Sequence, residues 1–422
     1  MVQAALRAGT ADRRCVFETF TRRLPETRRY GVVAGTGRLL DLLEDFTFGD
    51  DELASLRDSG VVDERTCDWL STFRFSGDVD GYAEGEAYYP GSPVLTVSGT
   101  FAECVLLETL VLSVLNHDSA VAAAASRMVA AAGDRPLIEM GSRRTHEESA
   151  VAAARAAYVA GFASTSNLAA GARYGIPTAG TIAHSFVLAH DDEEAAFRAA
   201  VASHGPGTTL LVDTYDIREG IRRAVDIAGP GLGAVRIDSG DLAVVAHEAR
   251  RLLDSLGATQ TRIVVSGDLD EHSIAALAAA PVDAYGAGTS VVVGSGVPTA
   301  GMIYKLVEVE GRAVAKRSVN KATQGGRKTA VRRHRPSGTS TEEVLGSQCT
   351  PEALPGDRAL QVPLVRGGKR VDDGLDLAAA REHHALARRG VPWEGMKLSA
   401  GEPAIPTTFV ASPAVREEEE GR

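Results

Sequence analysis

The sequence predicts an α/β fold built around a parallel sheet. From Pro136 onward, short apolar runs recur, and each is followed by a polar or glycine-containing turn and a helical pattern. Parallel strands are continuously apolar because helices cover both faces of the sheet. Six such units within about 170 residues favour a barrel, whose functional face lies at the carboxyl ends of the strands. A doubly wound open sheet remains the alternative, because strand count does not separate the two.

Each predicted strand can be located in the sequence. The six are PLIEM (136–140), IPTAGTIAH (176–184), TTLLVD (208–213), GAVRID (233–238), TRIVVSGD (261–268) and VDAYGAG (282–288). Two helices of this region are expected to begin with capping boxes, one formed by Thr145 with Glu148 and one by Asp216 with Glu219.

The segments before Pro136 mix element types. Residues 73–99 alternate β-forming residues with Gly and Pro, which predicts short antiparallel strands. Residues 101–133 predict one or two buried helices that end at Gly133. We expect a first domain at 1–133 and a barrel domain at 134–305.

A third domain is expected at 306–422. It contains a basic segment (315–335), a hairpin around Gly367-Gly368, and an amphipathic helix that ends at Gly390. Lys321 and Lys328 of the basic segment are candidates to reach an active site. The acidic tail REEEEGR is expected to be disordered.

Composition excludes several classes of protein. The net charge of −11 argues against a protein that wraps nucleic acid. Four scattered cysteines form no CxxC pair, which disfavours a zinc site or a disulfide framework and fits a reducing cytoplasm. The Ala-rich run 121–133 is interrupted by Arg127 and is too short to span a bilayer. No secretory pattern opens the chain. We expect a cytoplasmic protein without a membrane or nucleic-acid partner.

Charged residues and glycines recur where the predicted strands end. They are Arg143, Arg144, His184, Asp213, Arg236, Asp238, Gly267, Asp268, Gly286 and Gly288. Arginine binds phosphate or carboxylate through paired hydrogen bonds. Aspartate accepts from ribose hydroxyls or holds Mg²⁺ through water. Glycines before helices bring backbone N–H groups to a phosphate. The set predicts a site for a sugar phosphate.

Each residue also has an ordinary structural interpretation. Arg143 and Arg144 could be a solvated surface pair, and residues 236–241 could form a common βα turn. Asp213 and Asp216 could serve only as helix caps. The run 286–290 lacks a full GxGxxG fingerprint, and His184 alone could equally be a buried core histidine. Recurrence at matching strand ends is what favours a functional site.

The chain resembles the nicotinate phosphoribosyltransferases, of the actinobacterial kind, in several long blocks that occur in the same order. The blocks include VFETFTRRLPETRRYGVVAGTGRLLD (16–41), EGEAYYPGSPVL (84–95), EMGSRRTHE (139–147), ASTSNLAAGARYGIPTAGTIAHSF (163–186), LLVDTYD (210–216), VRIDSGDL (235–242), VDAYGAGTS (282–290) and GGRKTAVRR (325–333). The resemblance implies an irregular α/β barrel of the type II phosphoribosyltransferase kind. It also implies an N-terminal α+β sandwich domain and a C-terminal extension.

The resemblance also implies a reaction. Nicotinate would attack C1 of 5-phosphoribosyl-1-pyrophosphate, which gives nicotinate mononucleotide and pyrophosphate in NAD salvage. ATP hydrolysis would be coupled to this step through a phosphorylated histidine, Mg²⁺ would be required, and the enzyme would be a homodimer with sites near the subunit interface.

Roles carry over onto matching residues. The phosphorylated histidine of the family lies in a GTxAHS context, which is His184 here. Arg236 is implied near the pyridine carboxylate and the phosphoribosyl group, and Asp238 at the ribose hydroxyls. Arg143 is implied at pyrophosphate or the ring. The other implied substrate residues are Met140, Arg144, Ser166, Asn167 and Asp213, and those at the 5-phosphate are Gly267, Asp268, Gly286, Gly288 and Thr289.

Two features of the resemblance bear on the substrate. Ser166 and Asn167 are uncharged where related nicotinamide enzymes have an aspartate, so the acid is favoured over the amide. Family members also begin with a D-x-Y-x-x-T-M-like segment whose tyrosine stacks on the pyridine ring. The printed chain begins at a stretch similar to that motif's methionine. Without the ring we expect weaker nicotinate binding, since such stacking contributes on the order of 1 kcal/mol.

Three other functions stay open from the sequence. A quinolinate enzyme of the same fold needs neither ATP nor the GTxAHS histidine and would require more cations for a second carboxylate. A nicotinamide enzyme or a catalytically silent paralogue would also have this overall pattern.

Overall fold

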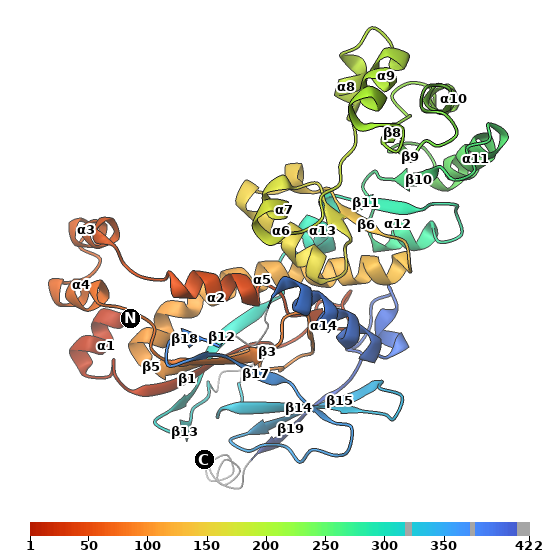
Figure 1. Cartoon of the computed structure of the whole chain (residues 1–422). Helices are drawn as coiled ribbons and strands as arrows, with labels where there is room; N and C mark the ends of the chain where they lie inside the picture. Colours follow the sequence, from red (N-terminus) through yellow and green to blue (C-terminus); the bar gives the residue numbers. More distant parts are fainter. Residues whose placement is uncertain (317–322, 372–375, 412–422) are drawn as a thin grey trace. The chain divides into compact units, whose positions relative to one another are not determined.

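The computed structural model describes residues 1–316, 323–371 and 376–411 (Figure 1). It divides into two compact units, Met1–Ala123 with Thr299–Arg422, and Ala124–Pro298. The two chain ends therefore share the first unit, because strands from both ends pair in one sheet, whereas the sequence predicted separate domains at 1–133 and 306–422. The helix α5 (Phe101–Ala132) contains the boundary between the units.

The second unit is an incompletely closed barrel of six parallel strands in the order β7-β6-β11-β10-β9-β8. The strands are β6 (Leu137–Glu139), β7 (Ser164–Thr165), β8 (Thr209–Leu211), β9 (Ala234–Ile237), β10 (Arg262–Val265) and β11 (Ala284–Ala287). Strands adjacent in sequence are adjacent in the sheet, except β7 and β8, which lie at its two edges, and β11 pairs with β6. This is the order of a barrel with no ladder between β7 and β8, so the predicted barrel is correct in topology.

The predicted strand at 176–184 is wrong. These residues form only an isolated bridge, Thr165 with Thr178, and His184 begins the short helix α8 (His184–Leu188). Pro177 has no N–H to donate and Gly180 weakens extended structure, so this run does not continue as a ladder strand. The strand that fills its place is β7, which the sequence analysis missed.

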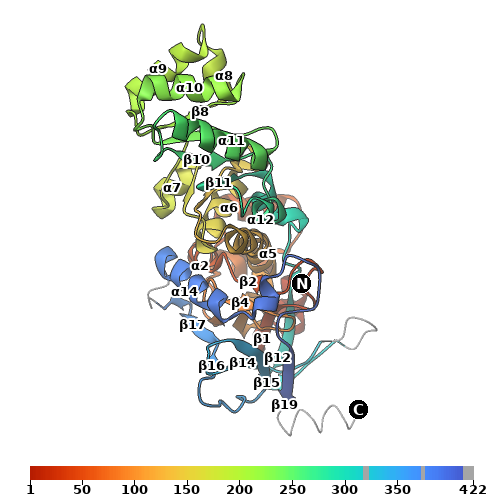
Figure 2. The same ribbon diagram turned by 90° about the vertical axis from the view of Figure 1, so that its right-hand side faces the viewer.

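Helices follow the strands of the second unit, and α9 and α10 pack side by side (Figure 2). They are α6 (Glu147–Val159), α7 (Leu168–Tyr174), α9 (Glu193–His204), α10 (Ile217–Ala228), α11 (Leu242–Ser255), α12 (Glu271–Ala276) and α13 (Thr289–Val292). Asp216 caps α10 by accepting from Glu219 N–H at 2.9 Å, as predicted, but the Glu219 side chain bonds Arg222 and does not complete the predicted capping box. The predicted cap at Thr145 is wrong, because His146 is the N-cap residue of α6 and its Nδ1 accepts from Glu148 N–H.

The first unit contains a seven-stranded sheet in the order β13-β12-β1-β5-β3-β17-β18. Its strands are β1 (Arg14–Thr21), β3 (Asp78–Tyr82), β5 (Leu95–Thr100), β12 (Met302–Val309), β13 (Arg312–Ala313), β17 (Gln361–Arg366) and β18 (Lys369–Arg370). Pairing of β1 with both β5 and β12 joins the two chain ends. The predicted antiparallel strands and the hairpin are confirmed, with φ values of 54° and 75° at Gly367 and Gly368.

Further helices belong to this unit, of which α3 and α4 lie to one side of the sheet, and a second sheet adjoins the first (Figure 1). The helices are α1 (Val2–Ala8), α2 (Thr36–Glu44), α3 (Asp50–Asp58), α4 (Glu64–Ser71) and α14 (Leu377–Gly390). The second sheet has the order β16-β14-β15-β19, formed by β14 (Lys328–His334), β15 (Ser340–Ser347), β16 (Arg358–Ala359) and β19 (Thr407–Ala411). A small pair is formed by β2 (Gly31–Val32) and β4 (Ala87–Tyr88).

The helix α5 is one continuous helix of 32 residues, longer than the Ala-rich run that the sequence analysis considered. By length and composition it could cross a membrane, but 56% of its most apolar stretch is buried inside the protein. Its residues Leu107, Val111 and Leu115 belong to the core cluster that packs on the seven-stranded sheet. A buried core helix can have the same length and hydropathy as a membrane-spanning helix.

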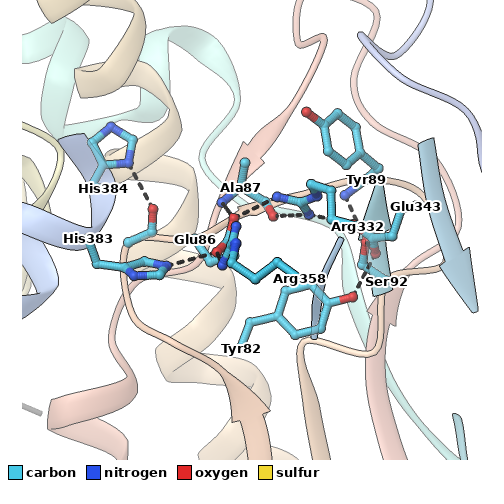
Figure 3. Close-up of polar contacts among 11 residues, drawn as sticks. Tyr82, Glu86, Ala87, Tyr89, Ser92, Arg332, Glu343, Arg358, His383 and His384 are labelled. Carbon is cyan, nitrogen blue, oxygen red and sulfur yellow. Dashed lines mark hydrogen bonds and ion pairs between the residues drawn. The ribbon is translucent and has the colours of Figure 1, made fainter. Parts of the chain in front are cut away.

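A buried polar network joins the N-terminal and C-terminal segments of the first unit (Figure 3). Arg332 on β14 donates to Glu86 beside β4, at 2.6 Å, and to Glu343 on β15. Arg358 and His383 also contact Glu86, at 2.6 and 2.8 Å. The contacts to Glu86 join segments that are far apart in sequence. The contact to Glu343 joins two strands that pair in the second sheet.

The basic segment 315–335 is only partly described. Lys328 lies buried and pairs with Glu18 on β1 at 2.8 Å, so its ammonium group faces the interior of the first unit. Lys321 and the tail 416–422 lie outside the described residues.

Candidate active site

Four predicted site residues form one cluster at the carboxyl ends of β8 and β9. Asp213 follows β8, Arg236 lies in β9 and Asp238 follows it, while His184 starts α8. His184 Nε2 lies 3.9 Å from Asp213 Oδ1 and 4.0 Å from Asp238 Oδ2. Its Nδ1 lies 3.1 Å from Thr214 Oγ1, at hydrogen-bond distance. The imidazole is therefore held at one nitrogen and faces two carboxylates with the other.

Arg236 holds three parts of the site together. Its Nε donates to Ser266 Oγ at 2.8 Å, its Nη1 to Thr181 Oγ1 at 2.8 Å, and its Nη2 to Asp238 Oδ1 at 2.9 Å. The fixed fork of a guanidinium lets one side chain donate from three separate nitrogens to partners that lie in different directions. Thr181 precedes His184 by three residues, so Arg236 also anchors the segment that leads to the histidine.

The two aspartates differ in environment. The Asp213 side chain is fully buried. Its Oδ2 accepts from Asp238 N–H and Ser239 Oγ–H at 2.8 and 2.7 Å, while its Oδ1 has no hydrogen-bond partner within the described chain. Burial would raise the pKa of Asp238, but the hydrogen bond from Ser266 and the charge of Arg236 outweigh it and lower that pKa. Asp238 is therefore a carboxylate at neutral pH.

The glycines predicted to cradle a phosphate lie where the backbone approaches closely. A Cβ at Gly267, whose φ is 111°, would lie 2.6 Å from the Asp238 carbonyl oxygen. A Cβ at Gly286 would lie 2.8 Å from Met140 Sδ. Gly288 precedes α13, which starts at Thr289, and Asp268 is exposed. The structure thus explains Gly267 and Gly286 by close packing against backbone and side-chain atoms, and the contact of these glycines with phosphate stays a prediction.

The loops after β6 and β7 form a second group of predicted residues. Arg143 and Arg144 lie in a 3-10 turn, exposed, and make no ion pair with any described residue. Asn167 donates from Nδ2 to Ser142 Oγ at 3.0 Å and caps α7 by accepting from Ala170 N–H. Ser166 is exposed. Of the two residues expected to donate to substrate, Ser166 is therefore the one whose side chain makes no hydrogen bond to another described residue.

Sequence reasoning missed several residues of the site. Ser266, Thr181 and Thr214 orient Arg236 and His184, and Glu139 connects the loops after β6 and β7. Ser266 lies within the predicted strand 261–268 and Thr214 directly follows the predicted strand 208–213, so their position was visible in the sequence. Their contacts were not, because they join residues 30 positions apart.

A hollow elsewhere does not compete with this site. It has a volume of about 920 Å³, lies in the first unit, and is lined by residues that include Phe20, Pro90 and Phe409. None of the predicted site residues lines it. In the described part of the chain, no group of three or more His, Cys, Asp or Glu residues could hold a metal ion without other ligands.

Comparison with known proteins identifies the family. Residues 1–116 match the model of the nicotinate phosphoribosyltransferase N-terminal domain, and residues 121–295 match that of the quinolinate phosphoribosyl transferase C-terminal domain. The chain is 61% identical to nicotinate phosphoribosyltransferase pncB1 of Mycobacterium tuberculosis, with 97% of this chain and 93% of that protein covered. The chain belongs to the nicotinate phosphoribosyltransferase family.

Solved structures confirm the fold of this family. The crystal structure of human nicotinic acid phosphoribosyltransferase matches with a TM-score of 0.86 at 25% identity, over 100% of this chain and 98% of that one. Nicotinate-nucleotide pyrophosphorylase from Pyrococcus furiosus matches with a TM-score of 0.77 at 25% identity, over 92% and 93%. The predicted irregular α/β barrel with additional N- and C-terminal parts is therefore confirmed.

Proposed function

We propose that this chain is a nicotinate phosphoribosyltransferase that acts in NAD salvage. It would join nicotinate to 5-phosphoribosyl-1-pyrophosphate, release pyrophosphate, and couple the step to ATP hydrolysis through phosphorylated His184. Membership of the family supports the transfer reaction. The observation that supports the coupling is the half-exposed His184 imidazole between two carboxylates, with its other nitrogen at Thr214.

His184 has the properties of a phosphoryl acceptor. With its proton on Nδ1 and shared with Thr214, Nε2 carries a lone pair that can attack the terminal phosphorus of ATP. The Nε2–P bond forms as the bond from phosphorus to the ADP oxygen breaks. Water later cleaves the phosphoimidazole to give inorganic phosphate. Asp213 and Asp238 would stabilise positive charge on the ring and keep its orientation fixed.

The same carboxylates fit the proposed Mg²⁺. Magnesium commonly binds through one or two carboxylates together with substrate phosphates, and not in an all-protein cage. Asp213 Oδ1 is buried and without a hydrogen-bond partner in the described chain, as an oxygen reserved for such a ligand would be. Asp213 and Asp238 would hold the ion, which supplies charge neutralisation for the departing pyrophosphate.

Arg236 and Ser166 are proposed to recognise the acid substrate. The guanidinium of Arg236 is fixed by three partners and carries the positive charge that a pyridine carboxylate requires. Ser166 offers an exposed hydroxyl donor, whereas an aspartate at this position would repel nicotinate.

A homodimer and a cytoplasmic location are part of the proposal. Large apolar side chains border the candidate site and are each more than half exposed, namely Leu168, Leu188, Tyr215 and Val244. Exposed apolar groups of this kind mark surfaces that associate, and a second copy of the chain is the simplest partner. Four free cysteines and a buried core helix are consistent with the cytoplasm.

One assay tests the function. Pyrophosphate release is measured with nicotinate, nicotinamide or quinolinate, each with and without ATP and Mg²⁺. We expect turnover with nicotinate and stimulation by ATP. Turnover restricted to quinolinate without ATP, or to nicotinamide, would replace the proposal by that activity. No turnover with any of the three would indicate a silent paralogue.

The role of His184 has its own test. His184→Ala should abolish ATP hydrolysis and ATP stimulation, because no other imidazole of the described site faces the two carboxylates. His190→Ala is the matched control, since His190 lies six residues away, bonds Phe186 O at 2.8 Å and contacts the Phe186 ring in a tilted arrangement. ATP stimulation that survives in His184→Ala would refute this role.

A further inference from the structure

Glu139 is a buried carboxylate at the end of β6, and it contacts two loops of the candidate site. Only 1% of its surface is exposed. Its Oε1 accepts from the N–H of Gly141, which begins the turn that carries Arg143. Its Oε2 accepts from Thr165 Oγ–H on β7 at 2.6 Å. The two oxygens of one side chain therefore hold two different strand exits.

The contacts of Thr165 extend this connection. Its Oγ1 accepts from Asn167 N–H at 3.0 Å, and Asn167 in turn bonds Ser142 of the opposite loop. The backbone of Ser166 donates to the Glu139 carbonyl at 2.8 Å. The loop after β7, which presents Ser166, is thus fixed to the loop after β6 by side-chain and main-chain bonds, most of which involve Glu139 or its partner Thr165.

Thr165 also connects Glu139 to the segment before His184. Its N–H donates to Pro177 O and its carbonyl accepts from Ala179 N–H, both at 3.0 Å. This segment crosses the gap where β7 and β8 do not pair, so no continuous ladder holds it. Its further anchor is the bond from Arg236 to Thr181. Glu139 therefore stands at one end of a chain of contacts that reaches the phosphate-accepting region.

The chemistry of Glu139 suits two donors. A carboxylate accepts at both oxygens, and glutamine accepts at only one and donates at the other. No neighbouring side chain within the described residues forms an ion pair with Glu139. Burial raises the pKa of Glu139, although the bonds from Thr165 and Gly141 oppose that shift. A buried carboxylate without a cation is unfavourable for folding, which points to a role beyond packing.

We propose that Glu139 is a positioning residue for the transfer reaction. It fixes the Arg143 turn and the Ser166 loop relative to each other, and so sets the geometry in which the substrate carboxylate is recognised. The inference rests on the proposed function, because the discrimination that it explains is that between nicotinate and its amide.

Glu139→Gln tests the proposal with almost no change in volume. We expect the KM for nicotinate to rise about tenfold, and the preference for nicotinate over nicotinamide in kcat/KM to fall by about the same factor, as for loss of one buried hydrogen bond. The KM for 5-phosphoribosyl-1-pyrophosphate should change less, because Gly267 and Gly288 are not tied to Glu139 through side chains. Thr165→Val should have a similar effect, and the double variant should be no worse than either single variant.

Glu193→Gln is the matched control. Glu193 is equally buried, its pKa is also raised mainly by burial, and it pairs with Arg223 on α10, with no bond to a loop of the site. It should lower the melting temperature without changing the KM for nicotinate. The proposal is overturned if Glu139→Gln and Thr165→Val change only the melting temperature, or if their effects on KM add. If the unsubstituted protein does not turn over nicotinate, the proposed function itself is wrong. If it does turn over nicotinate but the variants change only the melting temperature, only the role of Glu139 is wrong.

Discussion

Arg332 is expected to be the most important single side chain for the stability of the first unit. We consider Arg332→Met, which keeps much of the side-chain volume and removes the charge. Arg332 is 1% exposed and lies between Glu86 and Glu343 (Figure 3). Burial by itself would lower its pKa, but the carboxylates of Glu343 and Glu86 raise it above the usual range, so the guanidinium is charged.

The magnitude follows from what the substitution leaves behind. Arg332 donates to Glu86 Oε1 at 2.6 Å, to the Ala87 carbonyl at 2.7 Å and to Glu343, and it stacks 5.2 Å over the Tyr89 ring. Methionine replaces none of these donors. Removing one partner of a buried ion pair costs about 3 to 5 kcal/mol, because the remaining charge stays buried. That is a large fraction of the total stability of a typical domain, about 5 to 15 kcal/mol.

Denaturant unfolding monitored by circular dichroism would measure this loss. Arg333→Met is the control, since Arg333 is the next residue of β14, is one-third exposed, and pairs with Glu342 at 3.2 Å. A pair of that kind contributes about 1 kcal/mol or less. Adding Glu343→Gln to Arg332→Met should restore part of the loss, since it removes a buried charge. A loss in Arg332→Met no larger than that in Arg333→Met would refute the reasoning.

Three further predictions concern other parts of the chain. Burial lowers the pKa of His384 to about 4, so protons bind the unfolded chain preferentially below pH 6.5. The free energy of unfolding should fall by about 3 kcal/mol between pH 6.5 and 4, and His384→Gln should flatten that dependence in unfolding titrations. Arg236→Lys should reduce kcat/KM for nicotinate about 100-fold in steady-state assays, because one ammonium group cannot replace a three-way fork; a change below threefold contradicts this. Lys328→Met should lower the unfolding free energy by about 3 kcal/mol, because it leaves Glu18 unpaired, with the KM for each substrate unchanged in the same assays.

Much of the barrel could be predicted because its strands are apolar and bounded by turns. Five of the six predicted strands overlap strands of the sheet, including 261–268 with β10. The exception was the predicted strand at 176–184, which does not form, while the strand β7 was not predicted. Ser164–Thr165 is only two residues long and polar, so it carries no strand pattern. The run 176–184 is apolar, as a strand would be, but it lies beside the edge strand β7 and forms only one bridge with it. That position is defined only once the whole sheet has formed.

The site was predictable as a set of residues, and its internal connections were not. His184, Asp213, Arg236 and Asp238 meet as expected, because strand ends of a parallel sheet converge. Glu139 was overlooked, since one acidic residue at the end of PLIEM has no partner nearby in sequence. Thr165 lies 26 positions away. In β14, period-2 alternation places Lys328, Ala330 and Arg332 on one face, but it does not say that this face is the buried one.

The gap in the barrel explains why the candidate nucleophile lies where it does. A side chain within a ladder strand is confined by neighbours on both sides, whereas His184 starts a five-residue helix and is 42% exposed. A group that gains and loses a phosphoryl group needs access for ATP and water, and it also needs a fixed ring. In the proposed role, the exposed part of the His184 side chain would be reached by ATP and water. Arg236, through Thr181, and Glu139, through Thr165, provide the anchoring that a ladder would otherwise supply.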